Sequence, residues 1–470
     1  MGVVTRSKSK RRQLEEEAEA SGGEQDDVDL ISRLPDDVLG DVITLLPAED
    51  GARTQILSRR WLPLWRSAPL NLEATIHPAR LGVKENPAAA ILGAHGGPAR
   101  RLSLTWLGRS DEAPALDNLL RSPSLDNLRE FGLRYGTVVF SARPYKAPPP
   151  PPSMFRFSPT LRVLSVFARA CNLDFPRIDA DFPHLEQVTL RSVIIAESTL
   201  HGMLSRCPAL QSLMLHYNVG YRRLRISSST LRSLGVTATG SKDPMGKLEQ
   251  VIIDSAPLLE RLIPDGRSCC LQIRIIQAPK LKILRYSDDG IPAATIMVFK
   301  EMELLSLTNA MRTVKILALN TVPTLDVVIN LLQCFPCVEK LHIMVFTRGR
   351  FRNAPRYVSL ECLDAHLKVV QLTLYRGKRS EVNLVRFFLL NARMLESMKF
   401  IVDRAKCDDD WIASQHKKLQ LDIRASQGAR FAFEPQRQTF SCVPMEQIHN
   451  LELDDPFDGS RTYRYDFSWL

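Results

Sequence analysis

The sequence predicts an α/β protein, in which a small three-helix module precedes an irregular solenoid with a parallel strand face. Three observations lead to this prediction. Apolar residues at three- and four-residue spacing give the first folded segment helical faces. A short leucine-containing unit then recurs about ten times. A composition of 44% hydrophobic and 24% charged residues is that of a globular chain, and no apolar run is long enough for a transmembrane helix.

Residues 1–29 are predicted to form a disordered charged tail, because the segment lacks aromatic residues and cannot bury enough apolar area to offset chain entropy. Its run Lys8–Arg12 resembles a nuclear import signal, and a solvated basic tail is the equal alternative. No apolar core of an export signal occurs, so we expect the protein in the nucleus, the cytoplasm or both. The nine cysteines are then expected to be reduced and mostly buried.

The net charge of +10 is unevenly distributed. The first 30 residues contain five basic and eight acidic side chains, so the rest of the chain carries 57 basic against 44 acidic residues. A basic body favours an anionic partner, although a scattered surplus of this size is more often an ordinary surface. A second class of function therefore stays open, a basic repeat scaffold that binds nucleic acid or another anionic partner.

Three short helices are predicted in the first folded segment. The first has Pro35 in its first turn, where the missing N–H costs nothing, and ends before Pro47. The second covers Asp50–Leu57, and Ser58 is placed to cap the third, which carries Trp61. Three short helices cannot build a large core, so this module is expected to pack on a partner or on the next domain.

From about residue 99 the unit Pro-x-Leu-x-x-Leu-x-Leu, or a near variant, recurs along the chain. Its central copies are about 21–28 residues apart, which is the range of leucine-rich repeats. Alternating apolar side chains predict a strand, and stacking the next copy covers both its open edge and its apolar face. The proline marks the return from the outer side. The copies begin at Leu161, Leu185, Leu210, Leu231, Leu259, Leu281, Met302, Val338, Leu367 and Leu395.

Two segments resemble modules of known plant proteins. The motif Leu34-Pro-Asp-Asp-Val-Leu39, followed by Leu57-Ser-Arg-Arg-Trp61, resembles a plant F-box, with Gly51 where that motif more often has a helix former. The stretches His366–Leu372 and Phe387–Ala392 resemble the FBD segment that follows the repeats in plant F-box proteins. The order of these modules is similar to that of the F-box/FBD/leucine-rich-repeat family.

This resemblance implies a non-catalytic substrate-recognition subunit of a Skp–cullin–F-box ubiquitin ligase. The F-box would dock on a Skp-type adaptor, and through it on a cullin, while the repeats hold an unknown target protein. The expected order is a tail at 1–29, the F-box at 30–70, the solenoid at 71–355, an FBD-like continuation at 356–425 and a segment of unknown role at 426–470. The positions expected to contact the adaptor or support those contacts are Leu34, Pro35, Leu39, Ile43, Leu46, Leu57 and Trp61.

No signature of nucleotide, dinucleotide, hydrolase or zincin chemistry occurs, so no enzyme activity, cofactor or metal is predicted. The pair Cys334-Phe-Pro-Cys337 lacks a second ligand pair at zinc-site spacing, which favours core cysteines over half a zinc site or a redox pair. The proline run at 148–152 is expected to be a stiff loop rather than a ligand of a proline-binding module. Two arginine clusters could hold an acidic target or a small anion, against the alternative of ordinary surface charge. Their members are Arg222, Arg223, Arg225, Arg348, Arg350 and Arg352.

Overall fold

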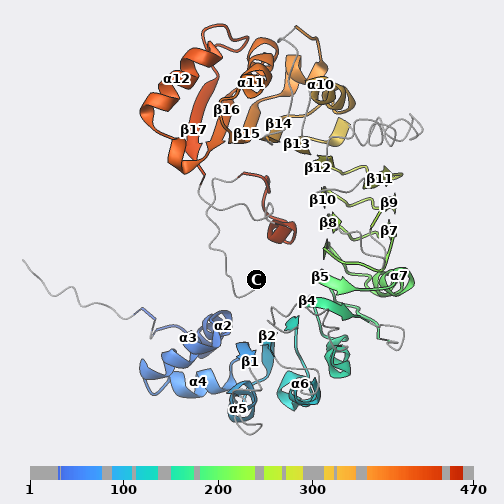
Figure 1. Cartoon of the computed structure of the whole chain (residues 1–470). Coiled ribbons are helices and arrows are strands. Elements are labelled where there is room, and N and C mark those ends of the chain that lie inside the picture. The colour runs from blue at the N-terminus through green and yellow to red at the C-terminus, as the bar shows by residue number, and fades with distance from the viewer. Residues whose placement is uncertain are drawn as a thin grey trace, which may run out of the picture. The chain divides into compact units, whose positions relative to one another are not determined.

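The computed structural model describes residues 30–31, 33–76, 87–107, 113–135, 150–173, 180–238, 248–266, 271–288, 312–321, 325–345, 357–436 and 445–458. The chain divides into two compact units, a small one and a large one (Figure 1). The small unit comprises Met1–Asn71 with His95–Gly97, and the large unit comprises Leu72–Ala94 with Pro98–Leu470. Among the described helices, none is long and apolar enough to cross a membrane. The predicted tail at 1–29 lies outside the described residues.

The described residues of the small unit form three helices and one 3-10 turn. They are α2 (Asp36–Leu45), α3 (Ala48–Arg53), η1 (Thr54–Ile56) and α4 (Trp61–Ser67). Pro35 and Pro47 immediately precede α2 and α3. Each proline has an extended backbone conformation and lies just outside its helix, where its missing N–H costs no helical hydrogen bond. The prediction that Ser58 caps the third helix is wrong. Its backbone carbonyl accepts the Trp61 N–H at 3.1 Å, and Arg60, which directly precedes α4, gives no side-chain cap.

The core of the small unit is correspondingly small. Leu39, Ile43, Trp61 and Ala68 are buried together, and Leu64 and Trp65 pack against them. This arrangement explains the glycine at position 51, because an added Cβ would lie 2.4 Å from the Trp65 ring. The glycine therefore allows α3 to approach α4 closely, at some cost in helix propensity.

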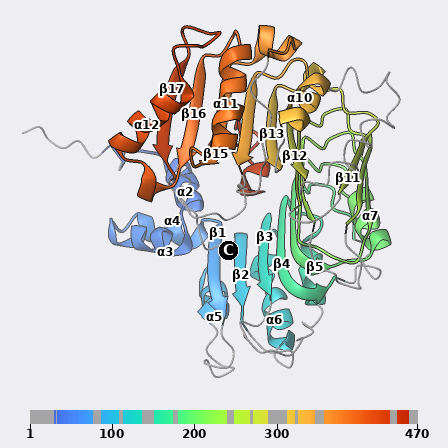
Figure 2. The ribbon, with the colours of Figure 1, turned by 45° about the horizontal axis from the view of Figure 1, so that its top comes forward.

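A 14-stranded sheet forms the large unit, and every pair with a described register is parallel (Figure 2). Each strand between the two ends pairs with the strand before it and the strand after it in this order, as in a solenoid. In spatial order the strands are β1 (Leu70–Ile76), β2 (Ala99–Trp106), β3 (Glu130–Tyr135), β4 (Val163–Asn172), β5 (Gln187–Ile194), β6 (Ser212–His216), β8 (Ser233–Ala238), β10 (Arg261–Gly266), β12 (Ile283–Asp288), β13 (Ile316–Thr321), β14 (Lys340–Val345), β15 (Val369–Tyr375), β16 (Ser397–Val402) and β17 (Arg430–Pro435).

The repeat leucines set the register of this sheet. Strand β6 begins two residues after Leu210, and β15 begins two residues after Leu367. The inward residues of neighbouring copies stack, as Leu213 does on Leu234, and both are completely buried. The predicted α/β fold with a leucine-rich-repeat strand face is thus confirmed. The copy expected at Met302 lies outside the described residues, and the strand that pairs with β12 is β13.

The outer side of the solenoid differs from copy to copy. A second sheet of three strands, ordered β11-β9-β7, lies outside the main sheet in the middle of the unit (Figure 1). These strands are β7 (Arg223–Ser227), β9 (Gln250–Ser255) and β11 (Gln272–Ile275). Other copies have helices there, namely α5 (Pro87–Ala94), α6 (Ala113–Leu120), α7 (Glu197–Ser205), α10 (Leu325–Cys334), α11 (Arg379–Asn391) and α12 (Asp409–Leu419). Some copies also contain short helical turns, namely η3 (Pro123–Leu125), η4 (Pro152–Phe157), η5 (Cys362–His366) and η6 (Arg404–Lys406).

Only residues 150–152 of the proline run are described. Pro150 and Pro151 are buried, and η4 begins at Pro152. This part of the run therefore packs as a connection within the solenoid, as expected for a structural loop.

Candidate functional site

The small unit exposes more apolar surface than its size requires. It contains nine of the fifteen large hydrophobic side chains that are exposed among the described residues. Leu34, which lies two residues before α2, is followed at three- and four-residue spacing by Val38, Val42 and Leu45 of α2, and we call this set of four the α2 stripe. The others are Leu30, Ile31, Ile56, Leu57 and Leu62. A contiguous apolar patch of this kind is typical of a protein-binding surface.

The seven residues expected at the adaptor surface fall into different environments. Leu39, Ile43 and Trp61 are at most 5% exposed and build the internal core, so they can only support a partner surface. Leu34, Pro35 and Leu57 are exposed, and Leu46 is half-buried. The sequence places Val38, Val42 and Leu45 in an apolar helix stripe, but neither they nor Ile56 were among the expected adaptor contacts. The available signal was that α2 has apolar residues on two faces, although one face suffices for packing.

In the large unit, the middle of the inner face of the main sheet is covered by a segment near the C-terminal end of the chain. Residues 445–458, which we call the strap, begin with the 3-10 turn η7 (Met445–Ile448) and lie on the side opposite the second sheet (Figure 1). Ile448 is completely buried against Met214 of β6 and Ile263 of β10. Every residue of β6 and β8 is buried, on both faces of the sheet. The strap thus converts the middle of an open strand face into a second core.

Arg261 on β10 binds the backbone of the strap. Its Nη1 donates to the carbonyl of Asn450 at 2.6 Å, and its Nη2 donates to the carbonyl of Leu451 at 2.9 Å and to that of Leu453. The side chain is only 4% exposed, so these carbonyls replace the water that a guanidinium would otherwise bind. These hydrogen bonds hold the backbone of residues 450–453 against β10.

Asp455 anchors the far end of the strap. Its carboxylate accepts hydrogen bonds from His342 Nε2 at 3.1 Å and from Lys340 Nζ at 3.3 Å, both on β14. Burial alone would raise the pKa of Asp455, but the His342 hydrogen bond, the neighbouring positive charges and the Phe457 N–H outweigh burial and lower this pKa to about 2. The Phe457 ring lies beside the Arg285 guanidinium, with 5.0 Å between its centroid and the guanidinium carbon.

His449 forms the third polar contact of the strap. Its Nε2 lies 2.7 Å from Thr189 Oγ1, and its Nδ1 lies 2.6 Å from Ser212 Oγ. Burial lowers the pKa of His449 to about 4, so the ring is neutral at pH 7. A neutral imidazole has one donor and one acceptor nitrogen, and hydroxyl groups can satisfy both.

Strands β3 to β5 carry a different inner-face group. Arg134 of β3 and Arg191 of β5 lie on the Phe167 ring of β4, with guanidinium carbons 5.2 and 5.3 Å from its centroid. All three side chains are half-exposed. Within the described part of the chain, neither arginine forms an ion pair, and Arg134 Nη2 is buried without a hydrogen-bond partner. Burial and the charge of Arg191 lower the pKa of Arg134. Two neighbouring like charges without a carboxylate form a candidate anion site.

The arginines singled out from the sequence lie elsewhere. Arg222, Arg223 and Arg225 are exposed at the start of β7, in the outer sheet. Arg225 already forms an ion pair with Asp254 at 3.0 Å. The other three, Arg348, Arg350 and Arg352, lie outside the described residues.

Six cysteines fall within the described residues, and all six are free thiols. Cys171, Cys207 and Cys362 are buried, and burial raises the pKa of each to about 12. Cys334, Cys337 and Cys407 are half-buried. The two cysteines of the Cys-x-x-Cys motif are therefore closer to the surface than core residues would be.

Comparisons with known proteins agree with the repeat architecture. A family model described as "FBD-associated F-box protein At5g56370, LRR repeats" matches residues 116–343, and the FBD model matches residues 358–400. The chain is 24% identical to the Arabidopsis thaliana "Putative F-box/FBD/LRR-repeat protein At3g49480" over 429 residues, which cover 78% of this chain and 88% of that protein.

Two further Arabidopsis thaliana proteins match over shorter stretches. "Putative F-box/LRR-repeat protein At5g02700" is 28% identical over 195 residues, or 40% of this chain and 39% of that protein. "Putative F-box/LRR-repeat protein At4g15060" is 28% identical over 248 residues, or 50% of this chain and 55% of that protein. The chain thus spans about half the length of these two relatives.

Proposed function

Because the chain belongs to the plant F-box/FBD/leucine-rich-repeat family, we propose that it is the substrate-recognition subunit of a Skp–cullin–F-box ubiquitin ligase. In this proposal the small unit is the F-box and docks on a Skp-type adaptor, which in turn binds a cullin. The repeats hold the target protein. The protein itself contributes proximity rather than catalysis, because a target held beside the ubiquitin carrier has a raised effective concentration.

The single observation that carries the proposal is the α2 stripe together with Ile56 and Leu57. Ile56 is 86% exposed and Leu45 is 73% exposed, so both residues lie mostly in water in the isolated chain. Burying a leucine or isoleucine against a partner is favourable by about 1.5–3 kcal/mol. Several such side chains on one small unit therefore favour a largely apolar interface, as proposed for the adaptor.

Docking of the small unit on the adaptor is tested by co-purification of the full chain with a plant Skp-type adaptor, at low and at moderate salt. We expect the wild-type complex to persist at both salt concentrations, because apolar contacts are not screened. Leu45→Asp should weaken it at least about tenfold, since a charge would replace a buried apolar contact. Ile423→Asp is the matched control, because Ile423 is similarly exposed (62%) but lies in the large unit. A well-folded wild-type chain that binds no Skp-type adaptor would overturn the proposal.

The residues on the inner face of β3 to β5 favour a target protein that binds there through an acidic segment. Arg134 and Arg191 lie on an aromatic ring, and a carboxylate placed between them would supply the counter-charge that neither has among the described residues. The strap covers the middle of the sheet, whereas the side chains of Arg134, Phe167 and Arg191 stay half-exposed in the part of the chain that the structure describes. The target of the proposed ligase subunit is therefore expected to present Asp- or Glu-rich chain.

The same arginines favour a second candidate function, a repeat scaffold that binds nucleic acid. The two functions differ in their salt dependence, because nucleic-acid binding releases counterions and weakens steeply with added salt. Binding of a random single strand would be compared for wild type and for Arg134→Gln/Arg191→Gln, with Arg222→Gln/Arg223→Gln as the control of equal charge on the outer sheet. Tight binding with a steep salt slope, lost only in the first variant, would favour the scaffold over the ligase subunit.

A further inference from the structure

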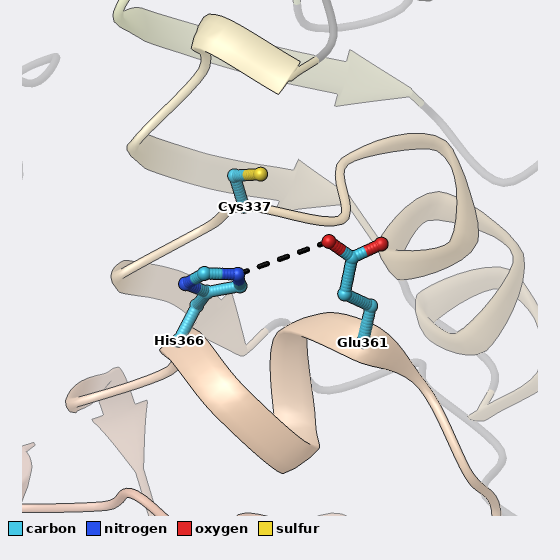
Figure 3. A group of neighbouring side chains, drawn as sticks. All are labelled: Cys337, Glu361 and His366. Atoms are coloured by element: carbon cyan, nitrogen blue, oxygen red, sulfur yellow. Dashed lines mark ion pairs between the residues drawn. The ribbon is translucent and has the colours of Figure 1, made fainter.

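Three side chains from two successive repeats converge on the large unit in an arrangement that the proposed function does not use. Cys337 lies in the turn between α10 and β14, while Glu361 directly precedes η5 and His366 is its last residue, shortly before β15 (Figure 3). The thiol sulfur, one carboxylate oxygen and one imidazole nitrogen all lie within 4.8 Å of one another. His366 Nε2 and Glu361 Oε1 are 3.9 Å apart.

The local backbone explains how Glu361 and His366 meet. The turn η5 is a π-helical turn, and the Leu367 N–H donates to the Cys362 carbonyl five residues earlier, at 2.7 Å. In an α-helix, residues five apart point about 140° away from each other. The wider π turn brings them to one side, and such turns are rare and frequent at functional sites.

These three groups are ligands that divalent zinc prefers. We propose that Cys337, Glu361 and His366 bind one zinc ion, with water in the fourth position. Tetrahedral zinc bonds of about 2.0–2.3 Å place ligand atoms about 3.4–3.6 Å apart. The observed separations need side-chain movements of about 1 Å or less to reach that geometry. Thiolate and carboxylate together balance the charge of the ion.

The residues around Cys337, Glu361 and His366 leave the proposed zinc position accessible to solvent. The side chains of Glu361 and His366 are 46% and 33% exposed, which leaves room for a water ligand. Arg312 donates to both carboxylate oxygens of Glu361 at 3.2 Å, and this exposed ion pair holds the carboxylate in place without strongly competing for it. Glu339, another carboxylate that interacts with His366, forms an ion pair with Lys315 at 2.9 Å.

The first test is a titration of the untagged, reduced, full-length chain with Co²⁺, which replaces zinc in such sites and reports on thiolate ligation. We expect one equivalent to bind with tetrahedral visible absorption and a near-ultraviolet thiolate-to-cobalt band, and zinc should displace it. Cys337→Ser should abolish the thiolate band, and His366→Ala should weaken binding at least about tenfold. Cys334→Ser is the matched control, because Cys334 belongs to the same Cys-x-x-Cys motif but not to the three-residue cluster.

The second test needs no variant and therefore does not depend on folding of Cys337→Ser. Thiol alkylation of the wild-type chain, mapped by mass spectrometry, should be slowed by zinc at Cys337 and unchanged at Cys334. A folded wild-type chain that binds no stoichiometric Co²⁺ would overturn the zinc site. A thiolate band lost in Cys334→Ser and kept in Cys337→Ser, or zinc protection of both thiols alike, would overturn it as well. None of these outcomes depends on adaptor binding.

Discussion

Asp455→Asn should release the strap at neutral pH. The Asp455 carboxylate is 8% exposed and accepts hydrogen bonds from His342 Nε2, Lys340 Nζ and the Phe457 N–H. Asparagine has nearly the same size, so this substitution removes the negative charge and leaves the packing of the strap unchanged. Any loss of strap binding then measures the charge of Asp455 and not a cavity.

The magnitude follows from the pKa of Asp455. Folding lowers this pKa from 3.8 to about 2, and each unit corresponds to about 1.4 kcal/mol, so the ionised carboxylate stabilises the bound strap by about 2 kcal/mol. Because the folded pKa lies below the unfolded one, the contribution is complete above pH 4 and is lost as the pH falls from 4 to 2. Asparagine does not titrate, so the difference between variant and wild type should shrink over that same window.

Hydrogen–deuterium exchange of the strap amides is the appropriate measurement, because it reports opening of the strap without global unfolding. At pH 7 we expect those amides to exchange about 30-fold faster in Asp455→Asn, as about 2 kcal/mol implies. Glu452→Gln is the matched control, since Glu452 is an exposed acidic residue of the strap. Equal effects of the two variants would refute the reasoning, and so would an undiminished difference at pH 3.

Two further predictions concern His449 and Gly51. Because burial lowers the pKa of His449 to about 4 from an unfolded value of 6.5, protonation favours release, and the strap of the wild-type chain should lose exchange protection as the pH falls from 6.5 to 4. His449→Gln should make strap exchange less dependent on pH. Some pH dependence should remain, because the pKa of His216 is also lowered to about 4. An unchanged pH profile would contradict the assignment of the effect to His449. Gly51→Ala gains helix propensity of up to about 1 kcal/mol, but its Cβ would lie 2.4 Å from the Trp65 ring. The clash should outweigh the gain, so we expect a net loss of about 1–2 kcal/mol in the stability of the small unit. Exchange of the α3 and α4 amides should therefore become faster. Slower exchange in Gly51→Ala would show that the Trp65 ring moves freely.

The strands of the main sheet could be predicted because their signal is local. Each repeat leucine of the described copies lies two residues before its strand, as Leu210 and Leu367 do. The next central copy repeats the pattern about 21–28 residues later. The outer sheet could not be predicted in the same way. Strand β7 has only two buried positions, Leu224 and Ile226, between exposed residues, and so short an alternation cannot be distinguished from a loop.

The candidate sites show the same limit at longer range. Arg261 binds a strap carbonyl 190 residues later in the chain, at Leu451, and no periodicity connects two such segments. A weaker signal was present, because Met214 and Ile263 place apolar side chains on the strand face that should meet water. The three-residue cluster was missed for a related reason, since Glu361 and His366 are brought together by a π turn and not by a recognisable ligand spacing.

The strap also restricts how a target could use the inner face of the repeats. To reach β6 to β10, a target would have to displace the strap and expose Ile448, Met214 and Ile263, which are at most 5% exposed. The Arg134–Phe167–Arg191 group lies on strands whose inner face is still half-exposed, so an acidic segment could bind there with the strap in place. Asp455→Asn distinguishes the two routes. If the strap blocks the target, this variant binds it more tightly than the wild type does. If the strap is a permanent part of the solenoid, loosening it leaves binding at β3 to β5 unchanged.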